Sequence, residues 1–80
     1  MTPLQQLKYK RLQKQHSKEA NWMCIANDGT IYAIYSVKPP VIKVANDGLH
    51  SFWYMTSYNV VGSIDVGKAF IGWQDTLVQL

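Results

Sequence analysis

The side chains that could carry catalysis or bind a metal are few and scattered along the chain. Metal binding could draw only on His16, Cys24 and His50, and their spacing matches none of the usual ligand patterns. Paired carboxylates for acid–base chemistry would have to come from Asp28, Asp47, Asp65 and Asp75. These aspartates stand beside turn-forming or terminal residues, where the carboxylate usually accepts backbone hydrogen bonds. No sequence pattern for an activated nucleophile or a phosphate-binding glycine loop is present. We therefore expect a protein that is not an enzyme and that uses neither a metal nor a cofactor.

A second group of side chains could bind an acidic partner. Residues 1–20 carry five cationic side chains and one carboxylate, a balance of +4, whereas the remaining residues have a balance of −1. Within the first segment, cations recur every three or four residues, at Lys8, Arg11, Lys14 and Lys18. This spacing suits a helix face that contacts phosphates, but lysine-rich outer faces are more often an ordinary solvated surface. Both interpretations remain open from the residues alone.

Aromatic side chains form the third candidate group. Three Trp, five Tyr and two Phe are many aromatic residues for a chain of 80, so some of them should be partly exposed, at an interface or a ligand site. A packing role in the core is the favoured interpretation for most of them. Phe52, Trp53 and Tyr54 are consecutive, so a strand would point them to alternate faces and could not bury all three on one side. Trp53 and Tyr54 are therefore candidate apolar anchors for a partner. Coverage of this segment by the N-terminal helix is the structural alternative.

The basic residues lie in a segment that favours a helix. Thr2 can cap it, Pro3 suits the first helical position, and Gln5 completes a capping box. Good helix formers follow, and Asn21 is a reasonable stop, so we expect a helix over residues 3–20.

The rest of the chain indicates antiparallel strands. Asn-Asp-Gly occurs at residues 27–29 and again at 46–48, each time between two apolar runs, and Asp-Gly in this position is typical of primed hairpin turns. Cys24 lies in one of these runs, which favours a small buried apolar role. The alternation predicts strands at 22–27, 30–37, 41–46, 49–55 and 60–64.

The last segment, residues 68–80, follows helical spacing in its apolar positions. A short helical turn is favoured there over a sixth strand. The whole chain of residues 1–80 is then one α+β domain: an N-terminal helix, an antiparallel β-meander of about five strands over residues 22–64, and a short C-terminal helical turn.

Several short sequence motifs are similar to those of a group of phage proteins. They are Trp22-x-x-x-Ala26-x-Asp28-Gly29, Ile31-Tyr32-Ala33, Lys38-Pro39 and Trp73-x-Asp75-Thr76-Leu77. Together they resemble small, mostly uncharacterised phage and prophage accessory proteins with an aromatic-x-Ala-x-Asp-Gly strand pair and a closing Trp-x-Asp-Ser/Thr-Leu. Thr76 stands where Ser is more usual. The resemblance covers residues 22–77 and implies a viral origin and an accessory role.

The resemblance and the lack of a catalytic pattern together imply a small non-enzymatic phage accessory protein that binds and inhibits a host macromolecule, with host defence or gene-expression machinery as the natural target class. The expected contacts are Lys8, Arg11, Lys14 and Lys18 for an acidic partner, with Trp53 and Tyr54 as apolar anchors. The alternative is direct binding of nucleic acid or a nucleotide, with the same cations on phosphates and Trp53, Tyr54 or Tyr58 stacking on bases. A virion component is a third possibility, and self-association is plausible for so small a sheet. No apolar stretch reaches about 18 residues and no leader is evident, so we expect no membrane partner and a location in the host cytoplasm.

Overall fold

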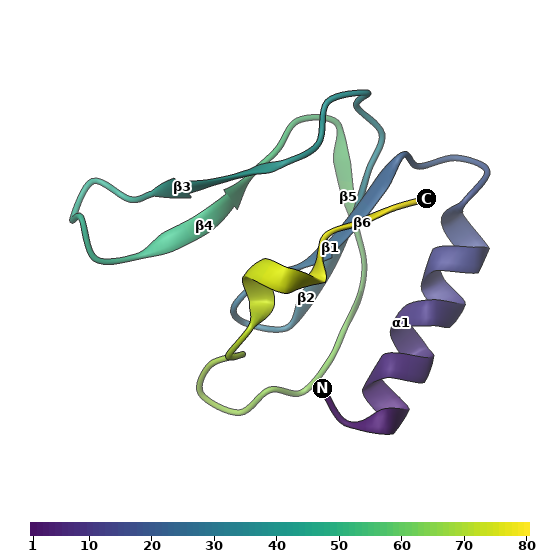
Figure 1. Ribbon diagram of the computed structural model, residues 1–80, viewed down its shortest axis with the longest axis horizontal. Coiled ribbons are helices and arrows are strands. Elements are labelled where there is room, and N and C mark those ends of the chain that lie inside the picture. Colours follow the sequence, from purple (N-terminus) through teal and green to yellow (C-terminus); the bar gives the residue numbers. More distant parts are fainter.

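The first element of the chain is helix α1, Pro3–His16, in a computed structural model that describes residues 1–80 (Figure 1). The predicted capping box is confirmed: Thr2 Oγ1 accepts from Gln5 N, and Gln5 Oε1 accepts from Thr2 N. The helix ends four residues before the predicted end at residue 20. Ser17 turns its hydroxyl back onto the carbonyl of Lys14, and such local bonds compete with helical continuation.

Four strands form the main sheet, in the order β5-β2-β1-β6 and with antiparallel neighbours. They are β1 (Trp22–Ile25), β2 (Thr30–Ile34), β5 (Tyr58–Ser63) and β6 (Val78–Gln79). β2 is therefore a central strand. β5 is an edge strand, and a bulge interrupts its pairing with β2 between Ile31 and Tyr32.

The other two strands, β3 (Val41–Val44) and β4 (Ser51–Tyr54), pair only with each other. Their hairpin extends along the longest axis of the molecule, away from α1 (Figure 1). The α+β class, with its N-terminal helix and antiparallel strands, is confirmed, but the strands do not follow one another as neighbours. β5 returns to β2 instead of pairing with β4. The predicted ranges of the first four strands contain the observed ones, and the fifth begins two residues earlier than predicted.

Both Asp-Gly segments form hairpin connections, but not primed two-residue turns. In the first, Gly29 N donates to Ala26 O and Ala26 N donates to Thr30 O, which closes a loop of three residues. In the second, Gly48 N donates to Ala45 O, and the loop has four residues. Primed type I turns need positive φ at two central positions, whereas only the glycine of each segment has it, +88° and +69°.

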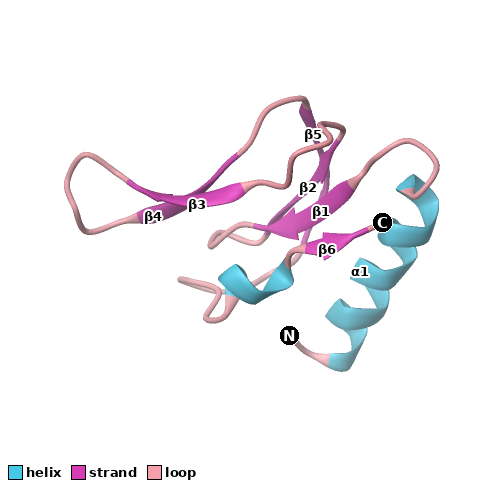
Figure 2. Cartoon of the chain, turned by 45° about the horizontal axis from the view of Figure 1, so that its top comes forward, coloured by secondary structure: helices cyan, strands magenta, loops and turns pink.

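The C-terminal segment holds both structures that the sequence left in competition. A 3₁₀ turn, η1 (Trp73–Thr76), is followed at once by β6, which pairs with β1. Thr76 connects η1 to both β1 and α1. Its Oγ1 accepts from Ile25 N at 2.8 Å, and its carbonyl accepts from the hydroxyl of Tyr9 at 2.8 Å. Figure 2 shows η1 between the hairpin and α1, close to the sheet.

The core lies on both faces of the main sheet. Paired residues of antiparallel strands share a face, so Met23, Ile25, Ile31 and Ala33 form one face. The side chain of α1 residue Leu12 reaches this face beside Ile31, where Gly62 leaves space for it. Trp22, Cys24, Tyr32 and Ile34 form the other face. Met23, Cys24, Ile25, Ile31, Ala33 and Ile34 are fully buried, and this confirms the apolar packing role of Cys24.

Candidate functional site

The four cations predicted on one helix face do not act as one set. Lys8 points back to the body and donates its Nζ to the carbonyl of Ser63 at the end of β5, 2.5 Å away. Arg11, Lys14 and Lys18 are exposed. The one ion pair of the structure joins His50 to Asp47, so no carboxylate pairs with these three cations. They are the part of the basic face that is available to a partner.

Trp53 is a core residue, which corrects its assignment as a surface anchor. Its side chain is 8% exposed, its Nε1 donates to the carbonyl of Ile25, and its ring meets that of Trp73 edge-to-face at 5.6 Å. The alternation of strand β4 then places Phe52 and Tyr54 on the opposite face of the hairpin, where they are 43% and 48% exposed. The covering element is η1, rather than the N-terminal helix.

The β3–β4 hairpin exposes apolar side chains on both faces. Val41 and Lys43 lie opposite Tyr54 and Phe52, so these four residues share the outer face. Lys43 places its Nζ 3.8 Å from the centroid of the Tyr54 ring, a cation–π contact. Exposed apolar side chains continue on the inner face and at the tip, with Ile42, Val44 and Leu49. We call Val41, Phe52 and Tyr54 the hairpin face.

A groove lined mainly by aromatic side chains separates the hairpin from the main sheet. One half, about 180 Å³, lies against the first Asp-Gly turn and is lined by Asp28, Tyr32, Phe52, Trp53 and Trp73, among others. The other half, about 320 Å³, shares Tyr32, Phe52 and Trp53 and continues to Tyr58. We call these two adjoining spaces the aromatic groove. Tyr32 and Tyr58 meet edge-to-face at 5.6 Å, so both sheet strands at the groove present an aromatic ring.

One carboxylate, Asp28, lies in this groove. Its Oδ1 accepts from Thr30 N at 2.9 Å, and hydrogen bonds from Thr30 lower the pKa of the carboxyl below its ordinary value. The pKa of Tyr32 is raised, first by burial and then by the negative charge of Asp28. Asp28 and Tyr32 line the same half of the groove, and the lowered pKa of Asp28 keeps its carboxyl ionised at neutral pH. No cationic side chain lines either half of the groove.

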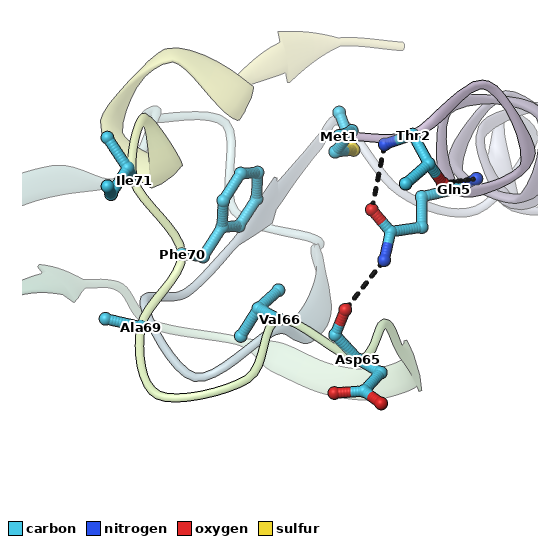
Figure 3. Close-up of a pocket in the computed structure, with 8 residues that line it drawn as sticks. All are labelled: Met1, Thr2, Gln5, Asp65, Val66, Ala69, Phe70 and Ile71. Atoms are coloured by element: carbon cyan, nitrogen blue, oxygen red, sulfur yellow. Dashed lines mark hydrogen bonds between the residues drawn. The ribbon is translucent and has the colours of Figure 1, made fainter.

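The largest hollow, about 420 Å³, lies between the N-terminus and the loop that follows β5 (Figure 3). Its polar groups are engaged within the protein. Gln5 Nε2 donates to the carbonyl of Asp65 at 2.7 Å, and Thr2 and Gln5 complete the helix cap. The Asp65 carboxylate accepts from Gly67 N. These bonds fasten the start of α1 to the loop, and we interpret this hollow as a structural joint.

The remaining titratable groups are not gathered into a site. Cys24 is buried, and burial raises the pKa of its thiol to about 12. His, Cys, Asp and Glu side chains form no group of three that could hold a metal ion. No helix of the structure has both the length and the apolar character needed to cross a membrane.

Comparisons with protein families, curated proteins and solved structures found no match for this chain. The aromatic groove and the hairpin face are therefore described from their own geometry. Sequence reasoning had named Trp53, Tyr54 and Tyr58, but it missed Asp28 and Tyr32 as neighbours of these residues. The Asp-Gly motif predicts a turn at this position, but nothing in the motif indicates that the turn lies beside the aromatic residues of β4.

Proposed function

We propose that the protein is a small non-enzymatic phage accessory protein that binds and inhibits a host protein, alone or in a complex with nucleic acid, in the host cytoplasm. The observation that carries the binding role is the exposed β3–β4 hairpin, with apolar side chains on both of its faces. The viral origin and the host target rest on the resemblance of residues 22–77 to phage accessory proteins.

Energetics favour a partner on this hairpin. A two-stranded sheet by itself is marginally stable in water, and here the second strand is tied to the core mainly through Trp53. Full burial of one Val or Phe side chain contributes about 1.5–3 kcal/mol. A protein partner that covered Val41, Phe52 and Tyr54 would therefore both gain affinity and order the hairpin. Tyr54 keeps the anchoring role predicted for it, and Phe52 replaces Trp53.

The test compares matched surface variants in a pull-down from host lysate. One variant changes the hairpin face (Val41→Thr, Phe52→Thr, Tyr54→Thr), which keeps β-forming residues in place. A second changes the free cations (Arg11→Gln, Lys14→Gln, Lys18→Gln). The control makes the same kind of change elsewhere, at two exposed apolar positions (Val60→Thr, Ile71→Thr). We expect a discrete host protein to bind the wild type and the control, to survive nuclease treatment, and to be lost from the hairpin-face variant.

The identified host protein is then titrated against the purified variants, and its own activity is measured with and without the phage protein. Loss of activity on binding supports inhibition. Equal binding by the hairpin-face variant and the control contradicts the proposed surface. A host protein that binds without any change in its activity contradicts inhibition as the function.

Direct binding of nucleic acid is the second candidate, and one observation favours it. Arg11 and Lys14 on α1, and Lys18 in the turn that follows the helix, are exposed and have no carboxylate partner. Each phosphate contact contributes about 0.7–0.9 to the slope of log affinity against log salt. Three contacts predict a total slope of about −2 to −3, which the triple Gln variant should abolish. A weak slope that this variant leaves unchanged would rule out this candidate.

A further inference from the structure

We propose that the half of the aromatic groove beside Asp28 binds an alkylammonium group, such as the head of a lysine or methylated lysine side chain, or a free quaternary amine. The groove presents aromatic rings and one carboxylate, and it contains no cationic side chain. The inference goes beyond the proposed function, since it concerns the space between the hairpin and the main sheet, which shares Phe52 with the hairpin face, and it can be measured on the protein alone.

The composition of the lining selects for positive charge. Aromatic rings attract a cation held over their faces, with about 0.5–1 kcal/mol at exposed sites and 2 kcal/mol or more when the cation is desolvated. Tyr32, Phe52, Trp53 and Trp73 come from three separate elements and converge on this space. Asp28 lines the same space and adds a formal negative charge to it. An anionic ligand such as a nucleotide would instead meet a carboxylate, which disfavours base stacking in this half of the groove.

The size of the site favours a head group over a whole cofactor. Its volume of about 180 Å³ is smaller than the roughly 300–1,000 Å³ that encloses drug-sized ligands. The adjoining space of about 320 Å³ past Tyr58 is also lined by apolar residues and leads away from the carboxylate. An alkyl chain attached to the ammonium group would lie there.

The carboxylate is held in place before any ligand arrives. Asp28 Oδ1 accepts from the backbone N–H of Thr30, and the turn that carries it is fixed by hydrogen bonds to the rest of the protein, including Phe70 N to Asn27 O at 2.8 Å. Binding therefore costs little side-chain ordering. Asp47 occupies the corresponding place in the second Asp-Gly turn, where it pairs with His50 at the hairpin tip. It offers a matched control.

The experiment is an NMR titration of the indole N–H signals. Choline is compared with its neutral isostere 3,3-dimethyl-1-butanol, and acetylated trimethyllysine amide and lysine amide are compared with choline to distinguish a side chain from a free amine. We expect the cations to shift the Trp53 and Trp73 signals saturably and to leave Trp22, whose Nε1 binds the carbonyl of Val37, unchanged. Asp28→Asn should weaken this binding about fivefold, and Asp47→Asn should not.

Phe52→Ala removes an exposed ring of the groove and provides a second variant that spares the core. This variant should also bind the cations more weakly than the wild type does. Equal shifts with the neutral isostere would overturn the proposal in favour of a plain apolar site. An identical response from the Asp28→Asn and Asp47→Asn variants, or no saturable shift with any of the cations, would overturn it as well.

Discussion

The same four residues, Ala-Asn-Asp-Gly, form two turns of this protein with very different surroundings. At 26–29 the turn is part of the body: Gly29 is buried, and its carbonyl accepts from Ile64 N at 2.9 Å. At 45–48 the turn is the exposed end of the hairpin, and no atom beyond Gly48 and its two chain neighbours lies within 4 Å of the position that a Cβ would take. The local sequence determines that a turn forms, whereas the segments that pack against the turn determine whether it contributes to the stability of the core.

Substitution of the two glycines by alanine should separate the turns most strongly. A Cβ at Gly29 would lie 2.1 Å from the carbonyl oxygen of Ile64, a backbone atom that must then move. We expect Gly29→Ala to destabilise the protein by about 3 kcal/mol or more, because steric overlap adds to the strain of positive φ. Gly48→Ala introduces only the strain of positive φ and should destabilise the protein by about 1 kcal/mol. Urea denaturation followed by tryptophan fluorescence measures both, and equal effects would contradict the comparison.

Substitution of Thr76 tests whether η1 stabilises the body next to the first turn. Its hydroxyl accepts from Ile25 N next to the first turn, and Thr76→Val would leave that buried donor without a partner. We expect a loss of about 2 kcal/mol in the free energy of unfolding. Thr76→Ser keeps the hydroxyl and is the control, with a smaller loss. Hydrogen exchange should report faster opening at Ile25 in the Val variant and little change across β3 and β4. Equal losses for Val and Ser would mean that the methyl group, not the hydroxyl, matters.

The smallest expected difference between the two turns is in their response to low pH. Hydrogen bonds from Thr30 lower the pKa of Asp28, and the backbone N–H of Leu49 is the first cause that lowers the pKa of Asp47. A carboxyl with a lowered folded-state pKa stabilises the protein above its ordinary pKa of 3.8 and loses this contribution as the pH falls toward the folded value. We therefore expect Asp28→Asn to flatten the loss of global stability in acid. Asp47→Asn should alter only the hairpin, as measured by NMR shifts during an acid titration. A larger global effect from Asp47→Asn would contradict this order.

Much of the local structure could be predicted from the sequence. The capping box at Thr2 and Gln5 begins the helix as expected, and both Asp-Gly segments connect antiparallel strands. These features depend on residues close together in the chain. The pairing of β5 with β2 does not, because Tyr58 and Ile34 are brought together by a connection whose route no local pattern specifies.

The candidate site was only partly predictable for the same reason. The alternation at Phe52, Trp53 and Tyr54 showed that both faces of the strand would be aromatic, but not which face would be covered. That choice depends on Trp73, which packs against Trp53 from a segment twenty residues away. Lys8 illustrates the opposite error: helical spacing placed it with the free cations, although the end of β5 supplies a carbonyl within its reach.

The buried thiol gives the protein a built-in reporter of its own opening. Cys24 is the one cysteine of the chain, it lies in a fully buried position of β1, and its raised pKa keeps it in the unreactive thiol form. An alkylating reagent can therefore modify the folded molecule only when the elements that cover this face of β1 move away. The labelling rate then measures how often Cys24 becomes exposed. A partner that stabilises the folded body would slow the labelling.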